Sequence, residues 1–117
     1  MKHLLFLGVI GISALSPSVF AAGHWAPVQG EYTVQSAPLS DPIPGSPPVA
    51  FFTIKGAAAK AMFDGMRDAK TEANACGENG LTMKFAENLV CSKQKGHYSC
   101  NFGVGLSDGK LRLAYTC

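Results

Sequence analysis

The sequence has little net charge and no run of basic residues. Its 117 residues carry 10 Lys and Arg against 8 Asp and Glu, and 15% of all residues are charged. Nucleic-acid-binding domains need a clustered basic surface, and proteins that bind a membrane surface need a polybasic stretch. The composition therefore favours a protein or a small molecule as the partner.

The sequence also lacks the usual signs of catalysis. A Ser or Cys nucleophile needs an activating base, and His24 and His97 are the only histidines after residue 21. No G-x-S-x-G motif occurs, and no glycine-rich phosphate loop joins a strand to a helix. We therefore expect the protein not to be an enzyme.

One long apolar run occurs, and it lies at the N-terminus. Leu4–Leu15 follows the basic Lys2, which is the layout of a secretory signal peptide. Val19 and Ala21 provide compact residues for a cleavage site after Ala21. Since the run is shorter than the roughly 20 apolar residues of a membrane span, we expect removal of residues 1–21 and a periplasmic or secreted protein.

The mature part contains four cysteines, Cys76, Cys91, Cys100 and Cys117. An even number of cysteines in a short exported chain indicates two disulfides. The C-x₂-C pairs of a zinc site are missing. A domain of this size has a small core, so we expect the disulfides to matter for its stability.

The mature chain divides at Val49 by composition. Residues 22–48 hold six of the seven prolines, which remove backbone donors and favour extended chain. This stretch is predicted to be an extended N-terminal arm with one short strand over residues 31–35. Residues 49–117 are predicted to form a disulfide-linked domain.

The domain is predicted to be α+β, with one amphipathic helix on a four- or five-stranded antiparallel sheet in the order β-α-β-β-β-β. The run VAFFTI, residues 49–54, is typical of a strand. Residues 57–70 show helical periodicity, with Ala59, Met62, Phe63 and Met66 on one face. Strands are expected over residues 81–85, 89–93, 98–104 and 111–117, where apolar and polar residues alternate.

The expected turns set the register of the cysteines. A hairpin loop over Gln94–His97 places Cys91 opposite Cys100, and a two-residue Asp108-Gly109 turn places Cys100 opposite Cys117. Cys100 can bond only one of them. We favour Cys91–Cys100 with Cys76–Cys117, which ties down the C-terminus, and the alternative is Cys76–Cys91 with Cys100–Cys117.

In its element order and its C-terminal cysteines, this outline resembles the cystatin arrangement of a helix on an antiparallel sheet. The Gln-x-Val-x-Gly loop through which cystatins inhibit does not occur here. The resemblance therefore extends to the outline, and no functional residue follows from it.

Two functions remain as hypotheses. The first is a protein-binding or inhibitor-like module with a partner in the cell envelope, whose contact residues are Trp25, Tyr32, His97 and Tyr98, since aromatic residues outside a core often mark interfaces. The second is Cu(II) or Ni(II) binding by the new N-terminus Ala22-Gly23-His24, whose nitrogens suit square-planar coordination.

Overall fold

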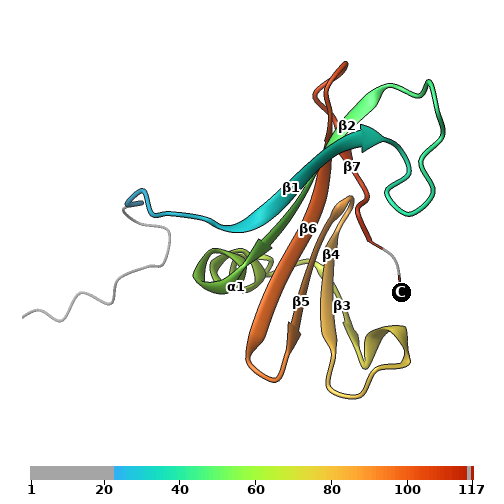
Figure 1. The fold of residues 1–117 in the computed structure, drawn as a ribbon. Coiled ribbons are helices and arrows are strands. Elements are labelled where there is room, and N and C mark those ends of the chain that lie inside the picture. Colours follow the sequence, from blue (N-terminus) through green and yellow to red (C-terminus); the bar gives the residue numbers. More distant parts are fainter. Residues whose placement is uncertain (1–22, 116) are drawn as a thin grey trace, which may run out of the picture.

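The protein is described by a computed structural model that covers residues 23–115 and 117 (Figure 1). The expected signal peptide and its cleavage site lie outside the described residues. The elements, in chain order, are β1 (Gln29–Ser36), β2 (Pro48–Lys55), α1 (Gly56–Gly65), β3 (Lys70–Ala73), the short 3-10 helix η1 (Ala75–Gly77), β4 (Thr82–Ala86), β5 (Leu89–Gln94), β6 (His97–Gly105) and β7 (Leu111–Arg112).

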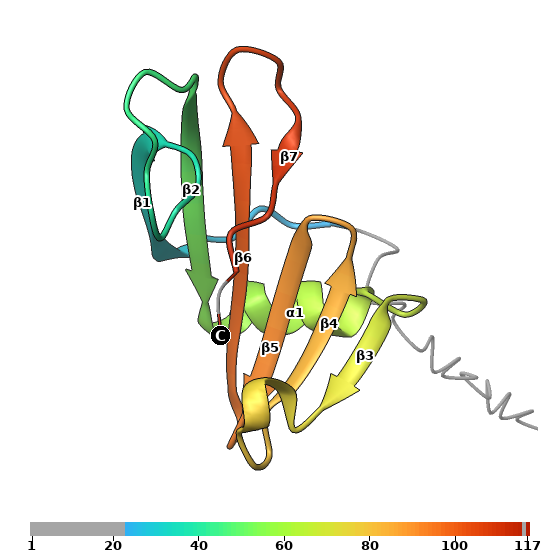
Figure 2. The same cartoon turned by 90° about the vertical axis from the view of Figure 1, so that its right-hand side faces the viewer.

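One helix packs on a seven-stranded antiparallel sheet, which confirms the predicted α+β class. The strand order is β1-β2-β6-β5-β4-β3, and β7 also pairs with β6. The nine-residue β6 has room for two neighbours along one edge, because β5 pairs with its first half and β7 with its second half. The helix lies across one face of the sheet (Figure 2).

The helix α1 starts where Gly56 turns the chain away from β2. Gly56 has φ +66°, a left-handed conformation that glycine adopts without strain. The helix ends at Gly65, and the amide of Met66 closes its last turn with bonds to the carbonyls of Met62 and Phe63. The predicted helical stretch to residue 70 was therefore too long. The chain beyond it forms β3, which pairs with β4.

The sheet carries hydrophobic clusters on both faces. The predicted apolar face of α1 packs on one side, where Ala59 and Phe63 are buried against Cys91 and Cys100. On the other side the C-terminal segment and the loop after β1 cover the sheet (Figure 1). Their clusters centre on Phe51 with Ala114, and on Met83 with Val90.

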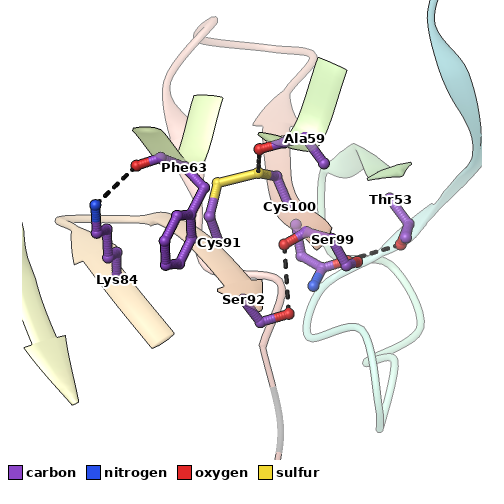
Figure 3. Close-up of a disulfide and its surroundings, with 9 residues drawn as sticks. Thr53, Ala59, Phe63, Lys84, Cys91, Ser92, Ser99 and Cys100 are labelled. Carbon is purple, nitrogen blue, oxygen red and sulfur yellow. Dashed lines mark hydrogen bonds between the residues drawn. A yellow bond between two sulfur atoms is a disulfide. The ribbon is translucent and has the colours of Figure 1, made fainter. Parts of the chain in front are cut away.

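The disulfides join Cys91 to Cys100 and Cys76 to Cys117, the first of the two pairings considered above. Cys91 and Cys100 are direct partners of β5 and β6, as the Gln94–His97 hairpin requires. Figure 3 shows this bond between the two strands and α1, next to Ala59 and Phe63.

The prediction for the last hairpin was wrong in its register and length. Gly103 pairs with Arg112, and the amide of Gly105 bonds the carbonyl of Lys110 at 2.8 Å, so four residues separate the paired positions. The carboxylate of Asp108 accepts a hydrogen bond from the backbone amide of Lys110 and another from the guanidinium of Arg112. These bonds hold the wider loop, and β7 ends at Arg112.

The stretch expected as an arm contains a strand of the sheet. The strand expected over residues 31–35 is β1, which pairs with β2 over eight positions from Gln29–Lys55 to Ser36–Pro48. Residues 23–28 lead into it and are exposed. The loop between β1 and β2 returns over the sheet face opposite the helix, where Leu39 packs against the cluster around Phe51.

Candidate binding surfaces

A band of apolar side chains crosses the sheet on the helix side, beyond the helix itself. Residues that are direct partners in the register share one face, as do alternate residues along a strand. Two rows follow from the pairing: Tyr32–Phe52–Phe102, and Val34–Ala50–Val104–Leu111. The third row on this face contains Ile54 and Cys100, which pack against α1. We call Tyr32, Val34, Phe52, Phe102, Val104 and Leu111 the apolar face.

The helix α1 leaves the apolar face uncovered because a single helix is narrower than the strands are long. A helix with its side chains is about 10–12 Å wide, whereas the nine residues of β6 extend about 30 Å. In Figure 2 the helix crosses the strands as one narrow band, and the upper parts of β2 and β6 extend well beyond it. Tyr32 is 74%, Val34 52% and Leu111 46% exposed.

The aromatic side chains of the apolar face contact one another in a line. The ring centroids of Tyr32 and Phe52 lie 6.4 Å apart, and those of Phe52 and Phe102 lie 5.2 Å apart in a stacked arrangement. Ring pairs at such distances attract each other beyond the apolar area that they bury.

The strand β1 forms one edge of the sheet. It pairs with β2, and no second strand pairs with it among the described residues. Its sequence, QGEYTVQS, contains no lysine and no proline, the residues that commonly protect an exposed edge from pairing. The free edge therefore lies directly beside the apolar face.

The other end of the molecule carries a cleft of about 970 Å³. It lies between the start of α1 and the β5–β6 hairpin, and Lys55, Lys60, Lys93, Lys95 and His97 are among the residues that line it. Asp64 accepts a hydrogen bond from Lys60 at 2.7 Å. This bond lowers the pKa of the Asp64 carboxyl, with further contributions from Lys84 and Lys93, and it raises the pKa of Lys60.

The four predicted contact residues fall into two separate places. Tyr32 belongs to the apolar face, and the fully exposed Trp25 lies on the segment that leads into β1. His97 and Tyr98 line the cleft. Tyr98 is also part of the core, because its ring meets Phe63 edge-on at 5.5 Å.

The sequence interpretation missed most of the apolar face. Phe52, Phe102 and Leu111 were assigned to the predicted strands, but their lack of cover depends on where α1 crosses the sheet. The alternation over residues 98–104 was the available signal, since it puts Phe102 and Val104 on one face.

The proposed metal site Ala22-Gly23-His24 lies partly outside the described structure. His24 is exposed, and Ala22 is not described. Within residues 23–115 and 117, no group of three or more His, Cys, Asp or Glu side chains is arranged to hold a metal ion. Ligation at the N-terminus would use backbone nitrogens and a single histidine, so it stays a prediction.

Comparison with models of known protein families, with curated proteins and with solved structures finds no match to this chain. Within the part of the chain that the structure describes, no helix combines the length and the hydrophobicity that crossing a membrane requires. A function must therefore be argued from the surfaces themselves.

Proposed function

We propose that the mature chain is an exported, non-catalytic protein-binding module, and that it binds its partner at the apolar face and the edge of β1. The observation that carries the proposal is the line of Tyr32, Phe52 and Phe102, whose rings contact one another on a part of the sheet that no described helix or strand covers. Tyr32 is exposed and Phe52 and Phe102 are half-buried, and aromatic side chains at a surface are typical of the energetic centre of an interface.

The free edge suggests the form that the partner takes. An extended segment can add to an exposed strand, gaining affinity from backbone hydrogen bonds and specificity from alternate side chains. A segment paired with β1 would continue the rows that begin at Tyr32 and Val34. The partner segment is therefore expected to carry apolar side chains at alternate positions.

Two variants of β1 distinguish an effect of the apolar face from a general effect of changing this strand. Val34→Lys places a charge on the apolar face, whereas Thr33→Lys places the same charge on an exposed residue of the opposite face. Mature, oxidised protein is used to capture partners from an envelope extract. A specific partner should bind the wild type and the Thr33→Lys variant, and Val34→Lys should weaken it about tenfold or more, the effect of losing 1.4 kcal/mol.

Hydrogen exchange then locates the contact. Backbone amides of β1 should become protected when the captured partner is added. If the Val34→Lys and Thr33→Lys variants bind equally, the surface is not the interface. If the wild type instead forms a concentration-dependent dimer that Val34→Lys abolishes, the occupant of the face is a second copy and the proposed partner class is wrong.

A further inference from the structure

The basic cleft gathers charges that are distant in the sequence. Lys55 is the last residue of β2, Lys60 lies in α1, and Lys93 and Lys95 belong to the β5–β6 hairpin. The antiparallel pairing of β2 with β6 places Lys55 opposite Ser99, close to the hairpin. A two-residue turn at Lys95-Gly96, where both residues have positive φ, presents the tip. A chain with almost no net charge thus acquires a strongly positive region.

The residues that line the cleft suit an anion. Four lysines supply positive charge, and His97, Gln29, Ser92, Gln94 and Ser99 supply further hydrogen-bonding groups. Among the described residues of the lining there is no Asp or Glu. Asp64, which lies outside the lining, offsets one charge through its bond to Lys60.

The ammonium groups are also held near one aromatic ring. The Nζ atoms of Lys60 and Lys93 lie 5.6 Å and 5.5 Å from the ring centroid of Tyr98. Tyr98 is fixed against Phe63 in the core. The ammonium groups of Lys60 and Lys93 therefore both lie near the ring of Tyr98, which packs against the core. Cation–π attraction to this ring helps to keep the two positive charges at the cleft.

From this geometry we infer that the cleft binds a small organic molecule that carries two or more phosphate groups. Its volume of about 970 Å³ is at the upper end of ligand sites and far exceeds one phosphate ion. Several separated ammonium groups fit several phosphate groups, since a lysine binds phosphate as a point charge. The ligand can be a free metabolite or the headgroup of a lipid, because the recognised chemistry is the same.

An acidic protein segment is the rival occupant. The planar fork of arginine binds both carboxylate and phosphate, whereas lysine without arginine is a common arrangement for phosphate, and among the described residues of the lining the cations are lysines and none is arginine. The phosphate ligand is therefore favoured, and an acidic polypeptide becomes one arm of the test.

The binding test uses the mature, oxidised protein and four probes. Inositol hexakisphosphate represents a soluble ligand, and vesicles of phosphatidylcholine with phosphatidylinositol bisphosphate represent a lipid headgroup. Inorganic phosphate and polyglutamate are the comparisons. Calorimetry or sedimentation should show binding of at least one multiply phosphorylated probe, at least tenfold tighter than inorganic phosphate or polyglutamate. Comparison of binding to the soluble probe and to the vesicles shows whether the ligand is a free metabolite or a lipid headgroup.

Variants that match in net charge locate the site. Lys93→Gln with Lys95→Gln removes two charges from the cleft, and Lys70→Gln with Lys110→Gln removes two exposed charges elsewhere. The first pair should weaken binding about tenfold, since exposed charge contacts contribute up to about 1 kcal/mol each. The second pair should leave the affinity nearly unchanged.

Nuclear magnetic resonance of the wild type provides a readout that does not depend on variants. Amide shifts caused by the bound probe should cluster at Lys55 to Lys60 and at Ser92 to Ser99. Equal weakening by both variant pairs, shifts spread over the whole surface, or equal affinity for polyglutamate would each overturn the inference.

Discussion

Cys91 and Cys100 lie directly opposite each other in β5 and β6, with their Cα atoms 4.0 Å apart and both side chains fully buried. The carbonyl of Ala59 in α1 lies 3.5 Å from the Cys100 sulfur. The disulfide thus contributes covalent cross-linking and core packing at the same place, beneath the only α-helix among residues 23–115.

Reduction of both disulfides should unfold the protein. Loop-closure entropy contributes about 3 kcal/mol for the Cys91–Cys100 ring and about 4 kcal/mol for the larger Cys76–Cys117 ring, and a core of this size provides only about 3–5 kcal/mol. Circular dichroism of the reduced, thiol-blocked protein should show no cooperative melt at the midpoint of the oxidised protein. An unchanged midpoint would show that the disulfides are dispensable.

Gly103→Ala should destabilise the protein by about 1–3 kcal/mol, the usual cost of overpacking. A Cβ at this position would lie 2.9 Å from Cγ1 of Val49 and 3.0 Å from Cδ1 of Phe51, both buried. Denaturant titration measures the change in the free energy of unfolding.

The combination of Gly103→Ala with Phe51→Leu provides the control. The smaller leucine side chain makes room for the added methyl group. The double variant should therefore lose less free energy of unfolding than the two single variants lose in sum. Strict additivity of the two changes would contradict close packing of Phe51 over Gly103.

The β6–β7 hairpin should weaken in acid. The backbone amide of Lys110 and the guanidinium of Arg112 hold the pKa of the Asp108 carboxyl below its ordinary value. A lowered folded-state pKa means that the stabilisation is complete above the unfolded-state pKa and is lost as the pH falls through the folded-state pKa. A carbon-13 titration of Asp108 measures this pKa directly.

Two variants test the cause of that shift. Arg112→Gln should raise the pKa of Asp108 towards its ordinary value, and Asp108→Asn should remove this part of the acid dependence of stability. Titration of Asp108 at the same pH in the wild type and in Arg112→Gln would exclude the guanidinium as a cause.

The mature N-terminus should bind Cu(II) if cleavage occurs after Ala21. Titration of mature protein is expected to give one site with the visible absorption of square-planar nitrogen coordination, and His24→Ala should lose it. A variant with one extra residue before Ala22 moves the histidine to position four and should also bind poorly. Equal binding by all three proteins would eliminate this site.

The parts of the fold that depend on local patterns were predicted well. Alternation located β4, β5 and β6, and the Gln94–His97 turn fixed the register that pairs Cys91 with Cys100. The helical period placed Phe63 in the core and Lys60 beside Asp64 in solvent.

The parts that depend on distant partners were not predictable in this way. The residues of β3 are all exposed, and their strand conformation comes from pairing with β4. Asp108-Gly109 is a common hairpin signal, but the Asp108 bonds to Lys110 and Arg112 select a longer loop. Both candidate binding surfaces depend on tertiary placement: the apolar face on the narrow cover given by α1, and the cleft on the meeting of β2 with β6.

The two disulfides are nested, and this divides the chain into two unequal parts. Strands β4 to β7 all lie inside the closed loop from Cys76 to Cys117, which contains the smaller loop from Cys91 to Cys100. The described residues before Cys76 have no disulfide to this part and are joined to it by the continuing backbone and by non-covalent contacts. The boundary passes between β3 and β4 at one side of this part and between β2 and β6 at the other, and therefore between Phe52 and Phe102. Partial denaturation should therefore separate β2 from β6 and β3 from β4 and part the stacked rings of Phe52 and Phe102, while the disulfides keep the C-terminal strands linked.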